Sequence, residues 1–257
     1  MTLIERTAYP RFSRGLPVKE LHGAFSPGLE EIAWARGRTY SDEGLLALLV
    51  SLKSFQRLGR FPDFDEVPAV VVEHVRGVCC LDRAVAWAPV PNRSAKRYRQ
   101  WVRERVGVRL DVPAALALAE EVMRRGALAK DNPADLINMA LEELVRGRLE
   151  LPGYTSLDRL AAAVRTEVND SFVALVRSRL TGQDMERIAA LMVVDPRTRR
   201  SGVEDLKRRP VRASVERVRR HVAHRQWLSS LGEGVPAVSA AEAPDMQVGR
   251  PSGRLGP

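Results

Sequence analysis

A strongly basic stretch of the sequence holds the side chains best suited to bind a polyanion. The segment SAKRYRQWVRERVGVR, residues 94–109, contains six cations and one anion, Glu104. The six cations are Lys96, Arg97, Arg99, Arg103, Arg105 and Arg109. Guanidinium and ammonium groups bind phosphate, and a guanidinium can also pair with the two acceptors of guanine. The composition therefore predicts a polyanionic ligand, with nucleic acid as the first candidate.

Helical spacing would place part of this charge on one face. Lys96, Arg99 and Arg103 recur at intervals of three and four residues, with Gln100 beside them. An adjoining apolar stripe is formed by Ala95, Tyr98, Val102 and Val106. A helix of this kind can pack by one face and present the other, as the recognition helix of a helix-turn-helix protein does, where Gln can pair with adenine. A solvated basic helix without a ligand is the alternative interpretation.

A second segment, SVERVRRHVAHRQWLSSLG at residues 214–232, repeats this design. One side of the expected helix carries Val211, Val215, Val218 and Val222, and the other carries Arg217, Arg220, His221 and His224. Binding to an anionic membrane is a weaker alternative, because the apolar face is valine and Trp227 lies alone at one end. This segment is also expected to contact DNA.

Residues for catalysis or metal binding form no recognisable pattern. Asp63, Asp65 and Glu66 lie close together, but in a loop that leads into a helix, where acids also interact favourably with the helix dipole. His221 and His224 lack a third metal ligand at a suitable spacing. The sequence contains no glycine-rich phosphate loop and no HExxH, GxSxG or paired CxxC motif. We expect no enzymatic activity, no catalytic or metal-binding residues and no cofactor.

The charge of the whole chain agrees with a polyanionic partner. The 257 residues include 41 Lys plus Arg and 32 Asp plus Glu, a formal charge of +9. Residues 197–225 hold eleven of the cations and three acids, a net charge of +8. The first fifteen residues lack the apolar core of a secretory signal, and no apolar stretch is long enough to span a membrane. We expect a cytoplasmic protein that binds no membrane.

The elements that carry these segments are predicted to be helices. Ser41 and Gly59 have the chemistry of an N-cap and a C-terminal stop around one clear helix. Helix starts are also expected at Ser26, Pro113, Asn132 and Ser156. Residues 67–81 are rich in valine, yet the valines recur at helical spacing, which predicts another helix. The basic segment is expected to be helical at about 93–106 and to end at Gly107. The expected fold class is all-α.

Composition divides the expected fold into four parts. Two small helical bundles, helix-turn-helix-like, are predicted at residues 1–110 and 111–195. A basic linker and helix would follow at 196–232. Residues 233–257 contain too few large apolar side chains to offset the entropy lost on ordering, so they are predicted to form a disordered tail.

Four blocks of the sequence are LGRFPDFDEVP (58–68), RYRQWVRERVGVR (97–109), LPGYTSLDRLAAAVRTEVNDSF (151–172) and SVERVRRHVAHRQWLSSLG (214–232). In order and spacing these blocks resemble the N-terminal region of the large replicative transposases of the Tn3 transposon family. In the second block, Arg97, Arg99, Val102, Arg103, Val106, Gly107 and Arg109 stand where the family pattern has Arg, Arg, Ile, Arg, Leu, Gly and Arg. Val108 departs from the pattern, because an aromatic residue is usual there.

The resemblance implies an all-helical pair of DNA-binding domains that recognise the terminal inverted repeats of a transposon. It also implies that the catalytic acids of the family belong to a far longer C-terminal part, and that this chain is a truncated or frameshifted form. Double-stranded DNA is thus the expected partner, with transposase subunits as a possible second one. The alternative function is a helical protein–protein interaction module that acts on those subunits through an acidic patch including Asp63, Asp65 and Glu66.

Overall fold

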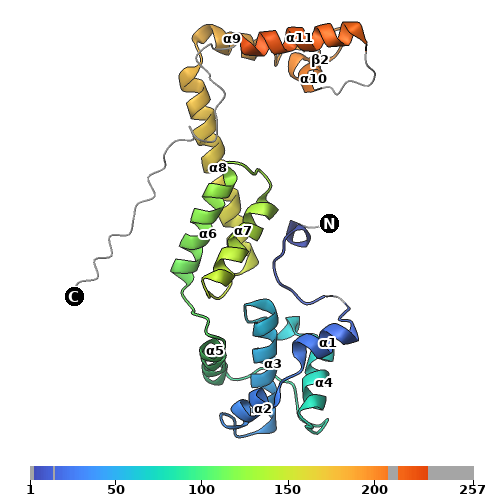
Figure 1. Cartoon of the computed structure of the whole chain (residues 1–257), viewed down its shortest axis with the longest axis vertical. Helices are drawn as coiled ribbons and strands as arrows, with labels where there is room; N and C mark the ends of the chain where they lie inside the picture. Colours follow the sequence, from blue (N-terminus) through green and yellow to red (C-terminus); the bar gives the residue numbers. More distant parts are fainter. Residues whose placement is uncertain (1–2, 14, 208–213, 231–257) are drawn as a thin grey trace, which may run out of the picture. The chain divides into compact units, whose positions relative to one another are not determined.

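The computed structural model describes residues 3–13, 15–207 and 214–230, and these are mostly helical (Figure 1). The α-helices are α1 Val18–Phe25, α2 Leu29–Arg36, α3 Asp42–Leu58, α4 Ala69–Val78, α5 Asn92–Val106, α6 Val112–Ala127, α7 Pro133–Arg146, α8 Tyr154–Arg179, α9 Gly182–Ala190, α10 Gly202–Lys207 and α11 Val215–Ser229. Two 3-10 helices, η1 Leu3–Arg6 and η2 Phe64–Glu66, and two short strands, β1 Val194–Asp195 and β2 Arg200–Ser201, complete the elements. The expected all-α class is confirmed. The tail predicted at 233–257 lies outside the described residues.

The chain divides into two compact units, Met1–Arg165 and Thr166–Pro257. Helix α8 begins in the first unit and ends in the second. The domain boundaries expected after residues 110, 195 and 232 stay predictions.

Helix α3 is the centre of the first unit. It packs against α1, α2, α4 and α5 (Figure 1). Its fully buried side chains include Leu46, Leu48, Leu49, Leu52, Phe55 and Leu58. Because neighbours cover α3 on several sides, its apolar residues are buried around most of the helix, whereas a surface helix buries one stripe. Each such side chain contributes about 1.5–3 kcal/mol of transfer free energy on burial.

The expected start and stop of α3 and stop of α5 are confirmed, as is the helix expected in the valine-rich segment. Ser41 Oγ accepts a hydrogen bond from the backbone nitrogen of Gly44 at 3.1 Å, which caps the start of α3. Gly59 ends α3 in the left-handed region, with φ +65°, and its nitrogen donates to Phe55 O at 2.7 Å. The valine-rich segment forms α4, and the basic segment forms α5, which ends at Gly107 with φ +71°.

Two expected helix starts were wrong. Helix α2 begins at Leu29 rather than beside Ser26, and Ser26 Oγ hydrogen-bonds His74 Nε2 at 2.7 Å. The Ser26 hydroxyl therefore binds a side chain of α4 and does not cap α2 as predicted. Helix α8 begins at Tyr154, so Ser156 lies inside it, and the Ser156 nitrogen donates to Gly153 O at 3.0 Å.

Gly59 provides a test of the left-handed stop that ends α3. A Cβ added there would lie 3.1 Å from Leu151 Cδ1, and the Leu151 nitrogen donates to Gly59 O at 3.1 Å. Gly59→Ala is expected to lower the free energy of unfolding by roughly 1–2 kcal/mol, because an L residue is disfavoured in this conformation. Urea unfolding measures the change. Gly23→Ala inside α1, where an added Cβ meets nothing within 4 Å, is the control and is expected to be neutral or stabilising. Equal losses in the two variants would contradict this account.

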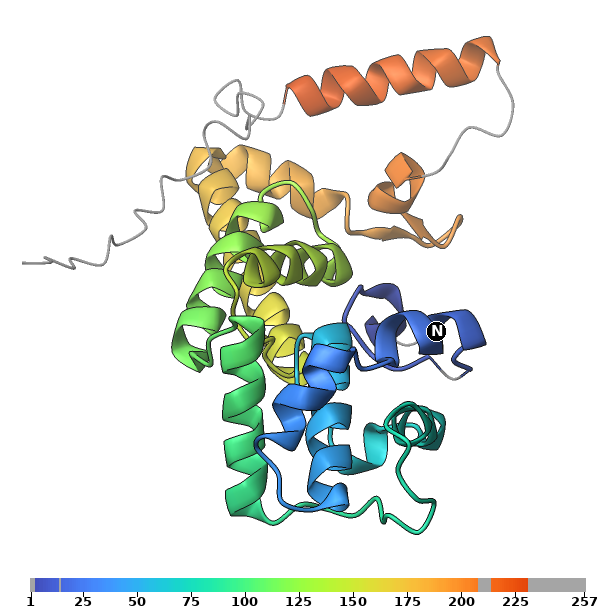
Figure 2. The same ribbon diagram turned by 60° about the horizontal axis from the view of Figure 1, so that its bottom comes forward.

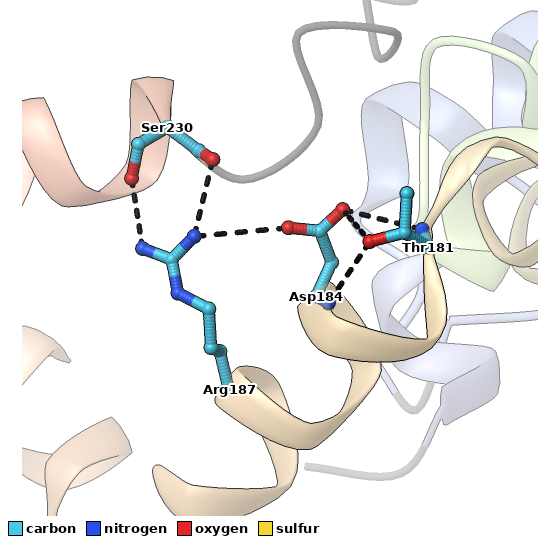
Figure 3. A network of polar contacts seen from close by, with 4 residues as sticks. All are labelled: Thr181, Asp184, Arg187 and Ser230. Atoms are coloured by element: carbon cyan, nitrogen blue, oxygen red, sulfur yellow. Dashed lines mark hydrogen bonds and ion pairs between the residues drawn. The ribbon is translucent and has the colours of Figure 1, made fainter.

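A polar network fixes the start of α9 in the second unit (Figure 3). Thr181 Oγ1 accepts from the Asp184 nitrogen at 3.2 Å and donates to Asp184 Oδ2 at 2.7 Å. Arg187 lies 3.7 Å from Asp184 Oδ1 and donates to Ser230 Oγ at 2.8 Å and Ser230 O at 3.2 Å. Since Ser230 directly follows α11, the network joins α9 to the C-terminal end of that basic helix.

A small hairpin follows α9. Strands β1 and β2 pair antiparallel, with Val194 opposite Ser201 and Asp195 opposite Arg200 (Figure 2). The Val203 nitrogen donates to Leu191 O at 3.2 Å, which closes the base of the hairpin. This hairpin was not predicted from the sequence, because its paired strands are only two residues long and lack an alternating pattern.

Candidate nucleic-acid interface

Helix α5 is anchored in the core by the apolar stripe expected from its sequence. Tyr98 and Val102 are buried, and α5 packs against α3. The approach is close, because a Cβ added to Gly44 of α3 would lie 2.9 Å from the Tyr98 hydroxyl oxygen. A side chain at Gly44 would therefore require the Tyr98 side chain to move, so the small residue at this position of α3 makes room for the ring that anchors α5.

The opposite side of α5 faces solvent. Lys96, Arg97, Arg99 and Gln100 are all exposed. Gln100 Nε2 donates to Glu104 Oε1 at 2.9 Å, so the amide keeps a second N–H and its oxygen for a ligand. The nine residues predicted to bind DNA are Lys96, Arg97, Arg99, Gln100, Arg103, Arg109, Arg217, Arg220 and His221. The structure brings the first four of them together on one exposed surface. We call these four residues the α5 ridge.

Arg99 lies at one edge of the α5 ridge, beside an aromatic surface. Its guanidinium carbon is 5.6 Å from the centre of the Phe61 ring. Arg99 also lines a pocket beside α5 together with Phe64, Trp87 and Tyr98. The stacked side chain keeps its N–H edge available, because a cation–π contact uses the face of the guanidinium.

Arg103 is positioned differently from the ridge residues. Its Nε donates to Glu150 Oε2 at 2.5 Å, and its guanidinium carbon lies 5.1 Å from the centre of the Phe61 ring. The Arg103 and Glu150 side chains are only 18% and 15% exposed. This ion pair fastens α5 to the segment before α8. Arg103 therefore has an internal partner, and its predicted DNA contact stays a prediction.

Arg109, just after the end of α5, also contacts the segment before α8, at Leu149. Its nitrogen donates to Arg148 O and its carbonyl oxygen accepts from the Glu150 nitrogen, both at 2.9 Å. Arg109 and Leu149 thereby form an isolated parallel bridge. The Arg109 side chain is exposed, so its backbone serves the fold and its guanidinium remains accessible.

The other predicted DNA-binding residues are in α11 of the second unit. Arg220 and His221 are exposed, and Arg220 Nη2 lies 3.6 Å from Glu216 Oε1. An exposed pair of this kind contributes little to stability, so Arg220 can exchange this partner for a ligand. Arg217 belongs to α11, but its side chain lies outside the described residues. The expected apolar side of α11 is itself exposed at Val215, Val218 and Val222.

The hairpin of the second unit presents three cations that were not among the predicted DNA-binding residues. Arg197, Arg199 and Arg200 are exposed around its turn. Asp195 organises that turn, because its Oδ1 accepts from the Arg197 nitrogen at 2.7 Å. The high charge of residues 197–225 was the available signal, but charge alone did not place these three side chains on a turn.

The acids of the predicted acidic patch are exposed, but two of them are used locally. Glu66 Oε2 accepts from the Asp63 nitrogen at 3.0 Å and from Arg60 Nη1 at 2.8 Å. The hydrogen bond from Arg60 lowers the pKa of the Glu66 carboxyl. In the described ranges, no three His, Cys, Asp or Glu side chains gather into a group that could bind a metal ion. The Glu66 carboxylate therefore caps the start of η2 by accepting from the Asp63 backbone nitrogen.

No helix within the described ranges combines the length and apolar character required to cross a bilayer.

The fold and the α5 ridge define a mostly helical protein with a cationic surface on its first unit. A family model described as "Domain of unknown function (DUF4158)" matches residues 1–164, which nearly coincides with that unit. The chain belongs to this family. The search of curated proteins finds no match.

Proposed function

We propose that the chain is a DNA-binding module that recognises terminal inverted repeats in DNA transposition, as the resemblance to Tn3-family transposases implies. The observation that carries the proposal is the α5 ridge: Lys96, Arg97, Arg99 and Gln100 are exposed on a helix whose other side is fixed in the core. Cations on a rigid helix bind phosphates, and Arg and Gln can pair with base edges in the major groove. The proposal assigns no reaction to this chain.

The net charge of the chain and the exposed donors of its second basic helix, α11, support the same proposal. A formal charge of +9 favours association with a polyanion. Helix α11 adds Arg220 and His221 as exposed donors in the second unit. Together these features support DNA contact by both units, with α5 as the element that reads sequence.

The test compares binding of the full chain to two DNA duplexes, one with a terminal repeat of the encoding element and one with the same bases scrambled. We expect tighter binding to the repeat. Arg99→Ala is expected to cost about 1–3 kcal/mol of binding free energy and to relax this preference if Arg99 pairs with a base. A phosphate contact would instead weaken both duplexes alike.

Arg146→Ala is the matched control, because Arg146 lies on α7 with its side chain 70% exposed. We expect it to leave the preference for the repeat intact. Equal affinity of the wild-type chain for both duplexes would refute sequence recognition, because nonspecific attraction to phosphate carries no sequence information. The protein–protein alternative would then be tested by direct binding to transposase subunits.

A further inference from the structure

Three arginines and two tryptophans alternate along one surface of the first unit. The Arg105 guanidinium carbon lies 4.9 Å from the centre of the Trp34 ring, and the Arg38 carbon lies 5.0 Å from the same ring. Arg38 is also 6.0 Å from the Trp101 ring, and Arg97 covers Trp101 at 5.1 Å. The order is therefore Arg105, Trp34, Arg38, Trp101, Arg97. We call these five residues the Arg–Trp row.

The row joins two elements that are distant in sequence. Trp34 belongs to α2 and Arg38 to the turn that follows it, whereas Arg97, Trp101 and Arg105 belong to α5. Both indoles are partly buried and pack against the hydrophobic core around α3. The three arginines are exposed. Each cation is consequently held against a surface that the core fixes, and stacking contributes about 0.5–1 kcal/mol at such exposed sites.

The arginines of the row keep their charge available. Among the described residues, no carboxylate lies within ion-pair distance of Arg38, Arg97 or Arg105, whereas Arg57 and Arg60 of the same unit are both paired with glutamates. Stacking occupies the faces of the guanidinium groups and leaves their N–H edges free for a planar or tetrahedral anion. Arg38 uses one N–H for a 3.4 Å hydrogen bond to Trp34 O.

We infer that the Arg–Trp row is a second DNA-contact surface, which binds the phosphate backbone beside the α5 ridge. This inference rests on the proposed function, and Arg97 belongs to both surfaces. Rigid, uncompensated guanidinium groups suit phosphate oxygens, and contacts to phosphate fix the position of a protein on a duplex without reading its sequence. The row would therefore set the orientation of α5, while the α5 ridge reads the bases.

The test measures how salt weakens binding of the full chain to a short duplex of mixed sequence, using fluorescence anisotropy between about 50 and 200 mM salt. The variant is Arg38→Gln with Arg105→Gln, which leaves the α5 ridge intact. The slope of log K against log salt is expected to become shallower by about 1.8, since each lost phosphate contact contributes about 0.9. Arg38→Lys with Arg105→Lys keeps the charge and is expected to retain most of the slope.

Arg125→Gln with Arg146→Gln is the control, because it removes the same charge from exposed positions on α6 and α7. We expect this control to keep the wild-type slope. A slope for the Arg38 and Arg105 variant equal to that of the control would overturn the inference. If Arg38→Gln with Arg105→Gln weakened binding to poly-glutamate as much as binding to DNA, the inference would also be overturned. That result would point to an acidic protein partner.

The two proposals fail in different ways. The difference in salt slope between the Arg38 and Arg105 variant and its control reports the Arg–Trp row, because phosphate contacts on mixed-sequence DNA need no preference for a repeat. If the Arg38 and Arg105 variant shows the expected shallower slope but the wild-type chain has no preference for the terminal repeat, the proposed function is contradicted and the Arg–Trp row is supported. If the slope of that variant is unchanged and the wild-type chain clearly prefers the repeat, the proposed function is supported and the row is contradicted.

Discussion

Replacing Phe55 by alanine is expected to lower the free energy of unfolding by about 3–5 kcal/mol, the largest stability change that we predict. Phe55 is 1% exposed in the last turn of α3, and its ring centre lies 4.6 Å from that of Phe61. Removal of the ring would leave a cavity among side chains that α1, α2, α4 and α5 hold in place around α3. The surroundings can collapse only partly, which is why the loss exceeds the transfer free energy alone.

The effect of Phe55→Ala should extend to the cationic surface. Phe61 is the ring on which both Arg99 and Arg103 stack, and Phe55 supports it from the core side. Urea unfolding measures the stability, and DNA affinity is measured under conditions where the variant is folded. Leu29→Ala is the control, because Leu29 is 86% exposed and its loss is expected to change stability by less than about 0.5 kcal/mol. Similar losses for both variants would contradict the packing described for α3.

Removal of Glu150 is expected to have the second largest effect, a loss of roughly 2–3 kcal/mol in the free energy of unfolding. The variant Glu150→Ala would leave the partly buried Arg103 without its carboxylate. The ion pair joins residues 47 positions apart, so its loss would also free α5 from the segment before α8. Arg103→Ala is expected to have a similar effect on stability, and the double variant should lose less than the sum of the two.

The same variants distinguish a structural anchor from a DNA contact. If Arg103 acts only as an anchor, Glu150→Ala and Arg103→Ala should change DNA affinity to a similar extent, because both release the same connection of α5. If Arg103 contacts DNA directly, Arg103→Ala should weaken binding more than Glu150→Ala does. Arg99→Ala, in contrast, should keep stability within about 0.5 kcal/mol and lower DNA affinity. A four-variant cycle with urea unfolding and duplex binding measures both quantities. Additive stability losses for Arg103 and Glu150 would show that the pair is not coupled.

Much of the local structure followed from short-range chemistry. Ser41, Gly59 and Gly107 delimit α3 and α5 where their side chains or backbone freedom predicted, and the spacing of the valines identified α4 as a helix. These features depend on residues within one or two turns of each other. The apolar stripe of α5 also predicted its buried side, with Tyr98 and Val102 in the core.

The partners of the α5 cations could not be predicted from the local sequence. Spacing alone placed Lys96, Arg99 and Arg103 on one presented face, yet Arg103 is paired with Glu150 and half-buried. Spacing also gave no reason to associate Arg105 with Trp34. The partner of a long side chain depends on which distant segment lies beside the helix, and intervals along one helix do not contain that information.

Helix caps, apolar periodicity and net charge are local or additive properties, so the amino-acid order alone predicts a helical and basic protein. Which cations are available to a ligand depends instead on tertiary packing. The packing of α3 against α5 placed Arg97, Arg99 and Lys96 in solvent, the approach of the segment around Glu150 engaged Arg103, and the position of α2 supplied the indole that orders Arg105. Each of these outcomes requires contacts between residues far apart in the chain, which form only when the core is assembled.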